Sequence, residues 1–147
     1  MGTRSAIGIS YQGVIKAIYN HSDGYMDYVG TVLNEHYQDT VKIIKLISMG
    51  DMSMLGKEIG VKIDFDARMA YDERDQAEQC RFYDRDRGET GVKHSTYHSE
   101  SAYVQGMANR DCEFMYLYKD GEWFVTTGTT FFPIAPLLMK ETVWPTK

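Results

Sequence analysis

Cysteine is scarce in this sequence, which contains only Cys80 and Cys112. The two residues stand far apart and match no metal-binding spacing, so we predict no disulfide framework, no metal site and no cofactor. No signal-peptide pattern precedes the first predicted strand, and the longest apolar run is too short to span a bilayer. We therefore expect both thiols to be free in a reducing cytoplasm, and we expect no membrane partner.

Positive charge is also in short supply. The chain has 16 Lys and Arg residues against 21 Asp and Glu, which gives a net charge of −5. A general nucleic-acid binder needs a dominant basic surface to meet the phosphates, so we expect no general nucleic-acid binding. Acidic and basic residues alternate within short stretches, a pattern that is typical of a solvated surface.

Proline is rare and confined to the C-terminal end, at Pro133, Pro136 and Pro145. We predict that residues 127–147 form an irregular tail packed on the body of the domain or on a neighbouring subunit. The apolar side chains of this tail either finish the core or contact another copy of the chain, and for this reason we expect a homo-oligomer. These side chains are Phe131, Phe132, Leu137 and Leu138.

Tyrosine, in contrast, is abundant. There are 11 tyrosines in 147 residues, a length that suits one domain with a single core. Many tyrosines on a small domain mark a binding surface, because each offers rigid apolar area and a hydroxyl. The alternative is that a strand-rich chain favours aromatic residues, and composition does not separate the two interpretations.

Two hairpins are predicted from alternating strands that meet at glycine-containing turns. The first joins residues 5–11 to 14–19 through Gln12-Gly13, and the second joins 113–118 to 122–126 through Asp120-Gly121. Shorter strands are predicted at 80–83 and 92–96.

Helical spacing of apolar residues predicts three helices, over 27–37, 40–49 and 100–109. Their predicted N-caps are Asp27, Asp39 and Ser99. The second helix would bury Val41, Ile43, Ile44, Leu46 and Ile47 and end at Gly50. Residues 50–56 would then form a turn that leads into one short helical turn, closed by Gly60. The chain as a whole, residues 1–147, is thus predicted to be a single α+β domain with an antiparallel sheet built from hairpins and two to three packed helices.

The stretch Tyr19–Tyr25 is the densest group of chemically active side chains. His21 and Asp23 follow the first predicted hairpin, and a His and a carboxylate in such a loop can serve as a general acid–base pair or as metal ligands. The alternative is structural: Asp23-Gly24 forms a turn, and His21 closes it through backbone hydrogen bonds.

A second candidate lies among Arg81, Arg85 and Arg87. Arginine suits phosphate and carboxylate groups, but Asp84, Asp86 and Glu89 could neutralise this cluster in a salt-bridged turn. If the turn lies beside the His21 loop, the two together would suit a small phosphorylated ligand. His94 and His98 share one face, but without a third ligand we interpret them as surface histidines.

Several short motifs in a fixed order resemble a family of small proteins encoded by tailed bacteriophages and prophages. The resemblance covers most of the chain to about Val125. It implies a setting, the cytoplasm of an infected host cell, where such accessory proteins bind host enzymes or nucleotide signals. The motifs are Gly2-Thr-Arg-Ser, Tyr19-x-His-x-Asp-Gly-Tyr25, His36-Tyr37, Gly50-Asp-x-Ser, Leu55-Gly56, Tyr83-x-Arg-Asp-Arg-Gly-Glu89 and Gly121-x-Trp-Phe-Val125.

Two functions are therefore predicted as alternatives. The first is a non-enzymatic phage accessory protein that binds a host protein and so counteracts a host defence or takeover target. The second is a pocket that sequesters or hydrolyses a small phosphorylated nucleotide, with His21 and Asp23 as the acid–base pair if a reaction occurs. The ligand-binding residues of that pocket would be Arg4, Ser5, Tyr19, Tyr25, Arg85 and Arg87.

Overall fold

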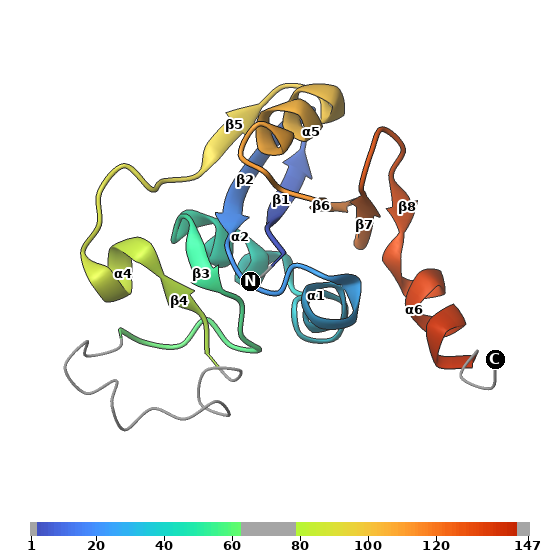
Figure 1. Cartoon of the computed structure of the whole chain (residues 1–147), viewed down its shortest axis with the longest axis horizontal. Coiled ribbons are helices and arrows are strands. Elements are labelled where there is room, and N and C mark those ends of the chain that lie inside the picture. Colours follow the sequence, from blue (N-terminus) through green and yellow to red (C-terminus); the bar gives the residue numbers. More distant parts are fainter. Residues whose placement is uncertain (1–2, 63–78, 144–147) are drawn as a thin grey trace.

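The computed structural model describes residues 3–62 and 79–143, with side chains placed as far as Leu138. In this part of the chain a sheet of eight strands carries helices on both faces (Figure 1). The strands are β1 (Ser5–Tyr11), β2 (Val14–Asn20), β3 (Met52–Met54), β4 (Arg81–Phe82), β5 (Ser95–Tyr97), β6 (Phe114–Lys119), β7 (Glu122–Thr126) and β8 (Phe132–Pro133). The helices are η1 (Met26–Gly30), α1 (Thr31–His36), α2 (Thr40–Ser48), α4 (Tyr83–Arg87), α5 (Glu100–Ala108) and α6 (Ile134–Val143).

The strand order is β4-β3-β2-β1-β6-β7-β8, and β5 pairs with the outer edge of β2. The single α+β domain is confirmed, but the prediction of a purely antiparallel sheet is wrong, because the sheet is mixed. The two hairpins β1–β2 and β6–β7 are antiparallel, whereas β1 pairs with β6 and β2 with β3 in parallel. Between β2 and β3 the chain passes through η1, α1 and α2, and such a helical crossover brings the next strand back in the same direction.

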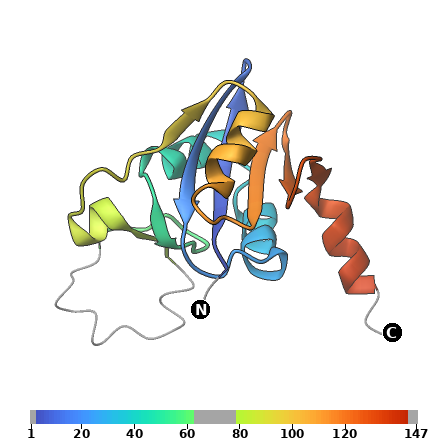
Figure 2. The same cartoon turned by 45° about the horizontal axis from the view of Figure 1, so that its top comes forward.

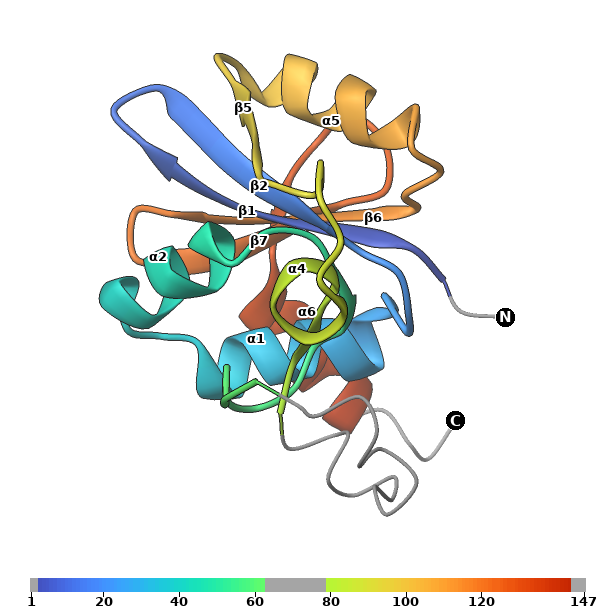
Figure 3. The same cartoon turned by 90° about the vertical axis from the view of Figure 1, so that its left-hand side faces the viewer.

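Two apolar clusters fill the space on either side of the sheet (Figure 3). Residues of β1 and β2 alternate between them: Ile7 and Ile18 pack under η1, α1, α2 and α6, while Ala6 and Ala17 pack under α5. The α5 side is built from small strand residues. A Cβ on Gly8 would lie 3.3 Å from the Tyr103 ring, so the glycine lets this large side chain of α5 reach the sheet.

The structure confirms two predicted helix caps and a predicted hairpin turn, all of which depend on interactions within a few residues. The Asp39 side chain accepts a hydrogen bond from the Val41 amide and begins α2, and Ser99 caps α5 through the Ala102 amide. At the tip of β6–β7, Asp120 and Gly121 have φ of 53° and 84°, the left-handed pair that a tight hairpin needs.

Other local predictions are wrong. Val41 and Ile44 were expected in the core but are 73% and 53% exposed. Tyr25 rather than Asp27 stands at the N-cap of η1, and the strand β3 lies within the stretch 50–56 that was predicted as a turn. The arginine-rich turn is a short helix, α4, which ends at the left-handed Gly88 with φ 71°.

The described part of the C-terminal tail is not irregular, because it forms β8 and α6. Pro136 is the third residue of α6, in the first turn, where a missing amide hydrogen removes no helical hydrogen bond. Ile134 is fully buried, and Leu137 and Leu138 pack against the same cluster, so the tail helps to complete the core. Phe132 is 54% exposed, and contact with a neighbouring subunit stays a prediction; residues 144–147 lie outside the described stretches.

Candidate functional site

Polar side chains gather on the α5 side of the sheet, past the C-terminal end of α5. Tyr19 near the end of β2 accompanies Ala17 on this face, and its hydroxyl lies 2.9 Å from Nδ1 of His21. The guanidinium of Arg110, which follows α5, lies 4.6 Å from the centre of the Tyr19 ring. Arg4, immediately before β1, interacts with the Tyr19 hydroxyl. These four residues and Asp51 are called the arginine–tyrosine cluster below.

Asp51 fixes the geometry of this cluster. Its carboxylate is 5% exposed; Oδ1 accepts a hydrogen bond of 2.9 Å from the Tyr19 amide and Oδ2 one of 2.9 Å from Nη2 of Arg110. The Asp51 carbonyl accepts from the Tyr83 amide, and its amide donates to the Val92 carbonyl. Two hydrogen bonds of the backbone and two of the carboxylate fix Asp51, which in turn positions the Arg110 side chain, itself 39% exposed.

The Tyr19 hydroxyl links two neighbouring side chains. It lies 2.9 Å from Nδ1 of His21, and the Arg4 guanidinium, which can only donate, acts on the same hydroxyl. Burial raises the pKa of the Tyr19 phenol, although the charge of Arg4 opposes this shift, and the phenol therefore stays protonated at neutral pH.

A largely apolar cavity lies beside α5. It has a volume of about 480 Å³ and lies between α5, the start of β6 and the loop after β7. Cys112 forms part of its wall, and burial raises the pKa of this thiol to about 12, while Arg110 and Arg4 act on it in the opposite direction. This cavity is called the α5 cavity below. Its wall also includes Val104, Ala108, Glu113, Phe114 and Thr127.

The remaining residues of the predicted His21 loop point elsewhere. Asp23 is exposed with φ 53°, and the amide of Gly24 donates to the Thr3 carbonyl, so Asp23-Gly24 forms a turn. His21 hydrogen-bonds to Tyr19 and not to Asp23, which leaves the predicted acid–base pair unassembled. Ser5 is fully buried beside Asn20 on the opposite face of the sheet, and Tyr25 packs edge-on against Phe114.

The predicted arginine pocket is divided. The guanidinium of Arg85 donates to the carbonyls of Ile59 and Cys80 and to the Asp86 carboxylate, and its side chain is only 12% exposed. Arg85 therefore holds α4 against the preceding loop, as the salt-bridged alternative predicted. Arg87 is more exposed but pairs with Glu89 and lies over the Tyr83 ring.

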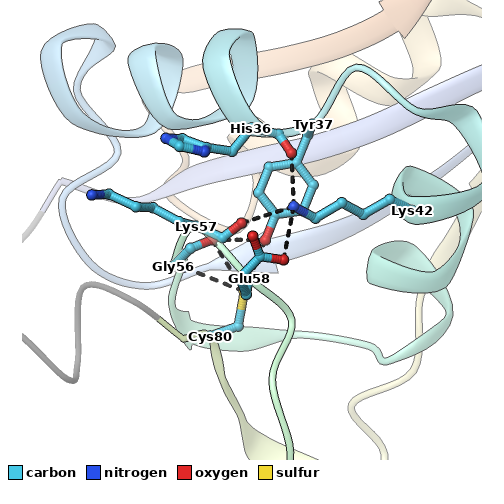
Figure 4. Close-up of polar contacts among 7 residues, drawn as sticks. All are labelled: His36, Tyr37, Lys42, Gly56, Lys57, Glu58 and Cys80. Atoms are coloured by element: carbon cyan, nitrogen blue, oxygen red, sulfur yellow. Dashed lines mark hydrogen bonds and ion pairs between the residues drawn. The ribbon is translucent and has the colours of Figure 1, made fainter.

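A second buried network is structural in character (Figure 4). The Tyr37 hydroxyl donates to the Gly56 carbonyl at 2.7 Å and lies 3.4 Å from the Cys80 sulfur. Lys42 lies over the Tyr37 ring and donates to the carbonyls of His36 and Lys57, so it closes the end of α1 onto the loop after β3. Burial raises the pKa of both Tyr37 and Cys80, which keeps these groups neutral and unreactive.

On the other face of the sheet, an apolar groove is lined by residues of the β1–β2 hairpin and of α2. Figure 2 shows the tip of this hairpin, in blue, at the top of the molecule. The volume of the groove is about 690 Å³. Tyr11, at the end of β1, is 72% exposed, and Ile44 of α2 is 53% exposed. We call it the hairpin groove; it is lined by Ile9, Tyr11, Gln12, Val14, Lys16, Thr40, Ile44, Ile47, Ser48 and His94.

Sequence reasoning missed Asp51, Arg110 and the whole hairpin groove. Asp51 belongs to the Gly50-Asp-x-Ser motif that contributes to the phage resemblance, and this was the one signal that could have identified it. Arg110 stands in an ordinary polar stretch, and nothing local distinguishes it.

No protein-family model, no curated protein and no solved structure matches the chain. Within residues 3–62 and 79–143, no helix is long and apolar enough to cross a membrane. The same residues contain no group of three or more His, Cys, Asp or Glu side chains placed to hold a metal ion.

Proposed function

We propose that the protein is a non-enzymatic accessory protein of a tailed phage, and that it counteracts a host defence or takeover target by binding a host polypeptide in the hairpin groove. The observation that carries this proposal is the exposure of large apolar side chains around one concave surface. Tyr11 and Ile44 leave more than half of their surface in water, and apolar surface that remains open in this way is a common mark of a protein interface.

The basic side chains at the groove indicate the charge of the partner that would bind there. Lys16 and His94 line it, Lys45 follows Ile44 on α2, and no acidic residue stands among the described lining residues. This local excess of basic groups contrasts with the net charge of −5 for the chain. We therefore propose a partner segment that inserts apolar side chains and carries acidic residues beside them.

The setting comes from the ordered motifs that resemble the phage family. Accessory proteins of that kind act on host components in the cytoplasm of the infected cell. Binding by shape and charge requires no reacting group, and this agrees with a groove lined mainly by aliphatic and aromatic side chains.

Recovery of the tagged protein from infected bacterial cells tests the proposal, with Ile44→Glu as the groove variant. We expect the wild type to retain a host polypeptide in a fixed ratio and Ile44→Glu to lose it by at least about 10-fold, because the new carboxylate is desolvated beside an acidic partner. The matched control is Val61→Glu, which makes the same change from an exposed aliphatic side chain to a carboxylate at a position outside the groove. Equal retention by Ile44→Glu and the wild type would contradict the proposal.

A further inference from the structure

A further cavity, which the proposed function does not use, is bordered by the loop that joins β7 to β8. Its volume is about 390 Å³, and its lining includes residues of β7, β8 and α6, three elements that Figure 1 shows together at one edge of the molecule. The loop at residues 126–130 has the sequence Thr-Thr-Gly-Thr-Thr, and all five residues line the cavity. We call this cavity the threonine pocket.

Part of the lining is apolar and firmly placed. Val125 is buried in the core, and Met26, Phe114 and Leu137 pack against the same apolar cluster, so these four residues lie on one side of the sheet. Phe132 also lines the pocket, and its side chain is 54% exposed. The pocket thus offers one partly buried and one exposed aromatic ring to a ligand.

The threonine loop supplies the polar part of the lining. Its one hydrogen bond among the described residues runs from the Gly128 amide to Oγ1 of Thr126, over 3.0 Å. Thr127, Thr129 and Thr130 are exposed, and within the described stretches their hydroxyls take part in no hydrogen bond. Each of these hydroxyls can both donate and accept, so the loop can pair with a ligand that carries groups of either kind.

Charge is absent from the described lining residues. The charged residues next to them along the chain, Asp27 and Glu113, are both acidic and exposed. An anion in the pocket would meet no cation among these residues, and a cation would meet no carboxylate in the described lining. Either ion would lose water without gaining a partner, so the pocket favours an uncharged ligand.

We infer that the threonine pocket binds a small uncharged ring compound that carries several hydroxyl groups, the chemistry shared by free sugars and nucleosides. The ring packs on the aromatic side chains of Phe114 and Phe132, and its hydroxyls exchange hydrogen bonds with the threonine loop. Pockets for small molecules hold roughly 300–1,000 Å³ and combine a mainly apolar lining with a few polar groups, and this pocket has both properties.

The threonine pocket and the hairpin groove share no lining residue. They lie at opposite ends of β1, because Phe114 pairs with Ser5 at the start of the strand, whereas Tyr11 of the groove is its last residue. Six steps along a strand span about 20 Å. Loss of ligand binding in this pocket therefore leaves the groove intact, and the two proposals fail separately.

Ligand-observed NMR titrations of the full chain with adenosine, glucose and AMP test the inference. Adenosine binding without glucose binding would identify a nucleoside site, and the reverse would identify a sugar site. We expect Phe132→Ala to weaken the bound neutral compound by at least about 5-fold, because an exposed aromatic contact is lost. The double variant Thr129→Val, Thr130→Val should weaken it by a similar factor, since it keeps the shape of the loop and removes two hydroxyls.

Thr96→Val is the matched control, because it removes the hydroxyl of an exposed threonine of β5 that does not line the pocket. We expect it to change the affinity by less than about 2-fold. No binding of adenosine or glucose at about 10 mM, or unchanged binding in both pocket variants, would overturn the inference. AMP binding at least about 10-fold tighter than adenosine would also overturn it, as would sedimentation of a dimer that Phe132→Ala dissociates, since a second copy would then cover the pocket.

Discussion

At the scale of single residues, Tyr37 shows how the interior uses a polar atom. Its ring is fully buried, and its hydroxyl donates to the Gly56 carbonyl while the ring accepts Lys42 on one face. Removal of the hydroxyl would leave that buried carbonyl with only the weak donor of the Cys80 thiol, at 3.7 Å. Tyr37 is therefore a stabilising residue, although His36-Tyr37 is one of the motifs on which the predicted resemblance rests.

We expect Tyr37→Phe to lower the free energy of unfolding by about 1–3 kcal/mol, the usual cost of a buried polar group left unsatisfied. Urea denaturation measures the change. Tyr11→Phe is the matched control, because Tyr11 is 72% exposed and its substitution should cost less than about 0.5 kcal/mol. Equal stability of the two variants would show that the hydrogen bond of Tyr37 contributes nothing.

At this scale, predictions were correct where a side chain hydrogen-bonds to a backbone amide a few positions along the chain. Asp39 and Ser99 cap their helices because each carboxylate or hydroxyl reaches an amide two or three positions along the chain. Asp51 and Arg110 were missed because they are 59 positions apart and meet only after the sheet has formed. Arg85 was assigned to a ligand because the sequence does not reveal which carbonyls surround a guanidinium.

At the scale of elements, the loop between β2 and η1 is held by close backbone packing. A Cβ on Gly24 would lie 2.6 Å from the Ser5 Cβ and 2.8 Å from the Thr3 carbonyl oxygen. The Tyr116 hydroxyl, from β6, donates a hydrogen bond to the Gly24 carbonyl. The glycine of the Asp-Gly-Tyr motif is thus needed for packing against β1.

We expect Gly24→Ala to lower the free energy of unfolding by about 1–3 kcal/mol, because Ser5 is buried and β1 cannot shift without losing its neighbours. Thermal or urea denaturation gives the value. Gly128→Ala is the control, since a Cβ there meets nothing within 4 Å. A variant Gly24→Ala as stable as Gly128→Ala would mean that the loop moves away from β1 at no cost.

Elements were predictable to different degrees for physical reasons. The tight turns of both hairpins require glycine and are visible in the sequence, and the strands beside them follow. The exposure of Val41 and Ile44 was not predictable from helical spacing, because α2 has more apolar residues than the sheet covers. The helix α6 was missed because prolines were taken to exclude a helix, although a proline in the first turn is compatible with one.

At the scale of the whole molecule, the sheet separates two surfaces of different character. The α5 face carries the arginine–tyrosine cluster and the α5 cavity, and the other face carries the hairpin groove with its apolar and basic lining. Neither surface was predictable from the sequence, since each combines side chains of a helix with side chains of strands or loops that lie elsewhere in the chain.

Site-specific photo-crosslinking in infected cells tests the central claim, binding of a host polypeptide in the hairpin groove, most directly. A photoreactive phenylalanine replaces Tyr11 inside the groove or, as the matched control, Tyr25 outside it, both being exposed tyrosines. We expect the Tyr11 position alone to give one major adduct, with a host segment that is rich in apolar and acidic residues. Adducts of equal yield from both positions, or an adduct only with a second copy of the chain, would contradict the account.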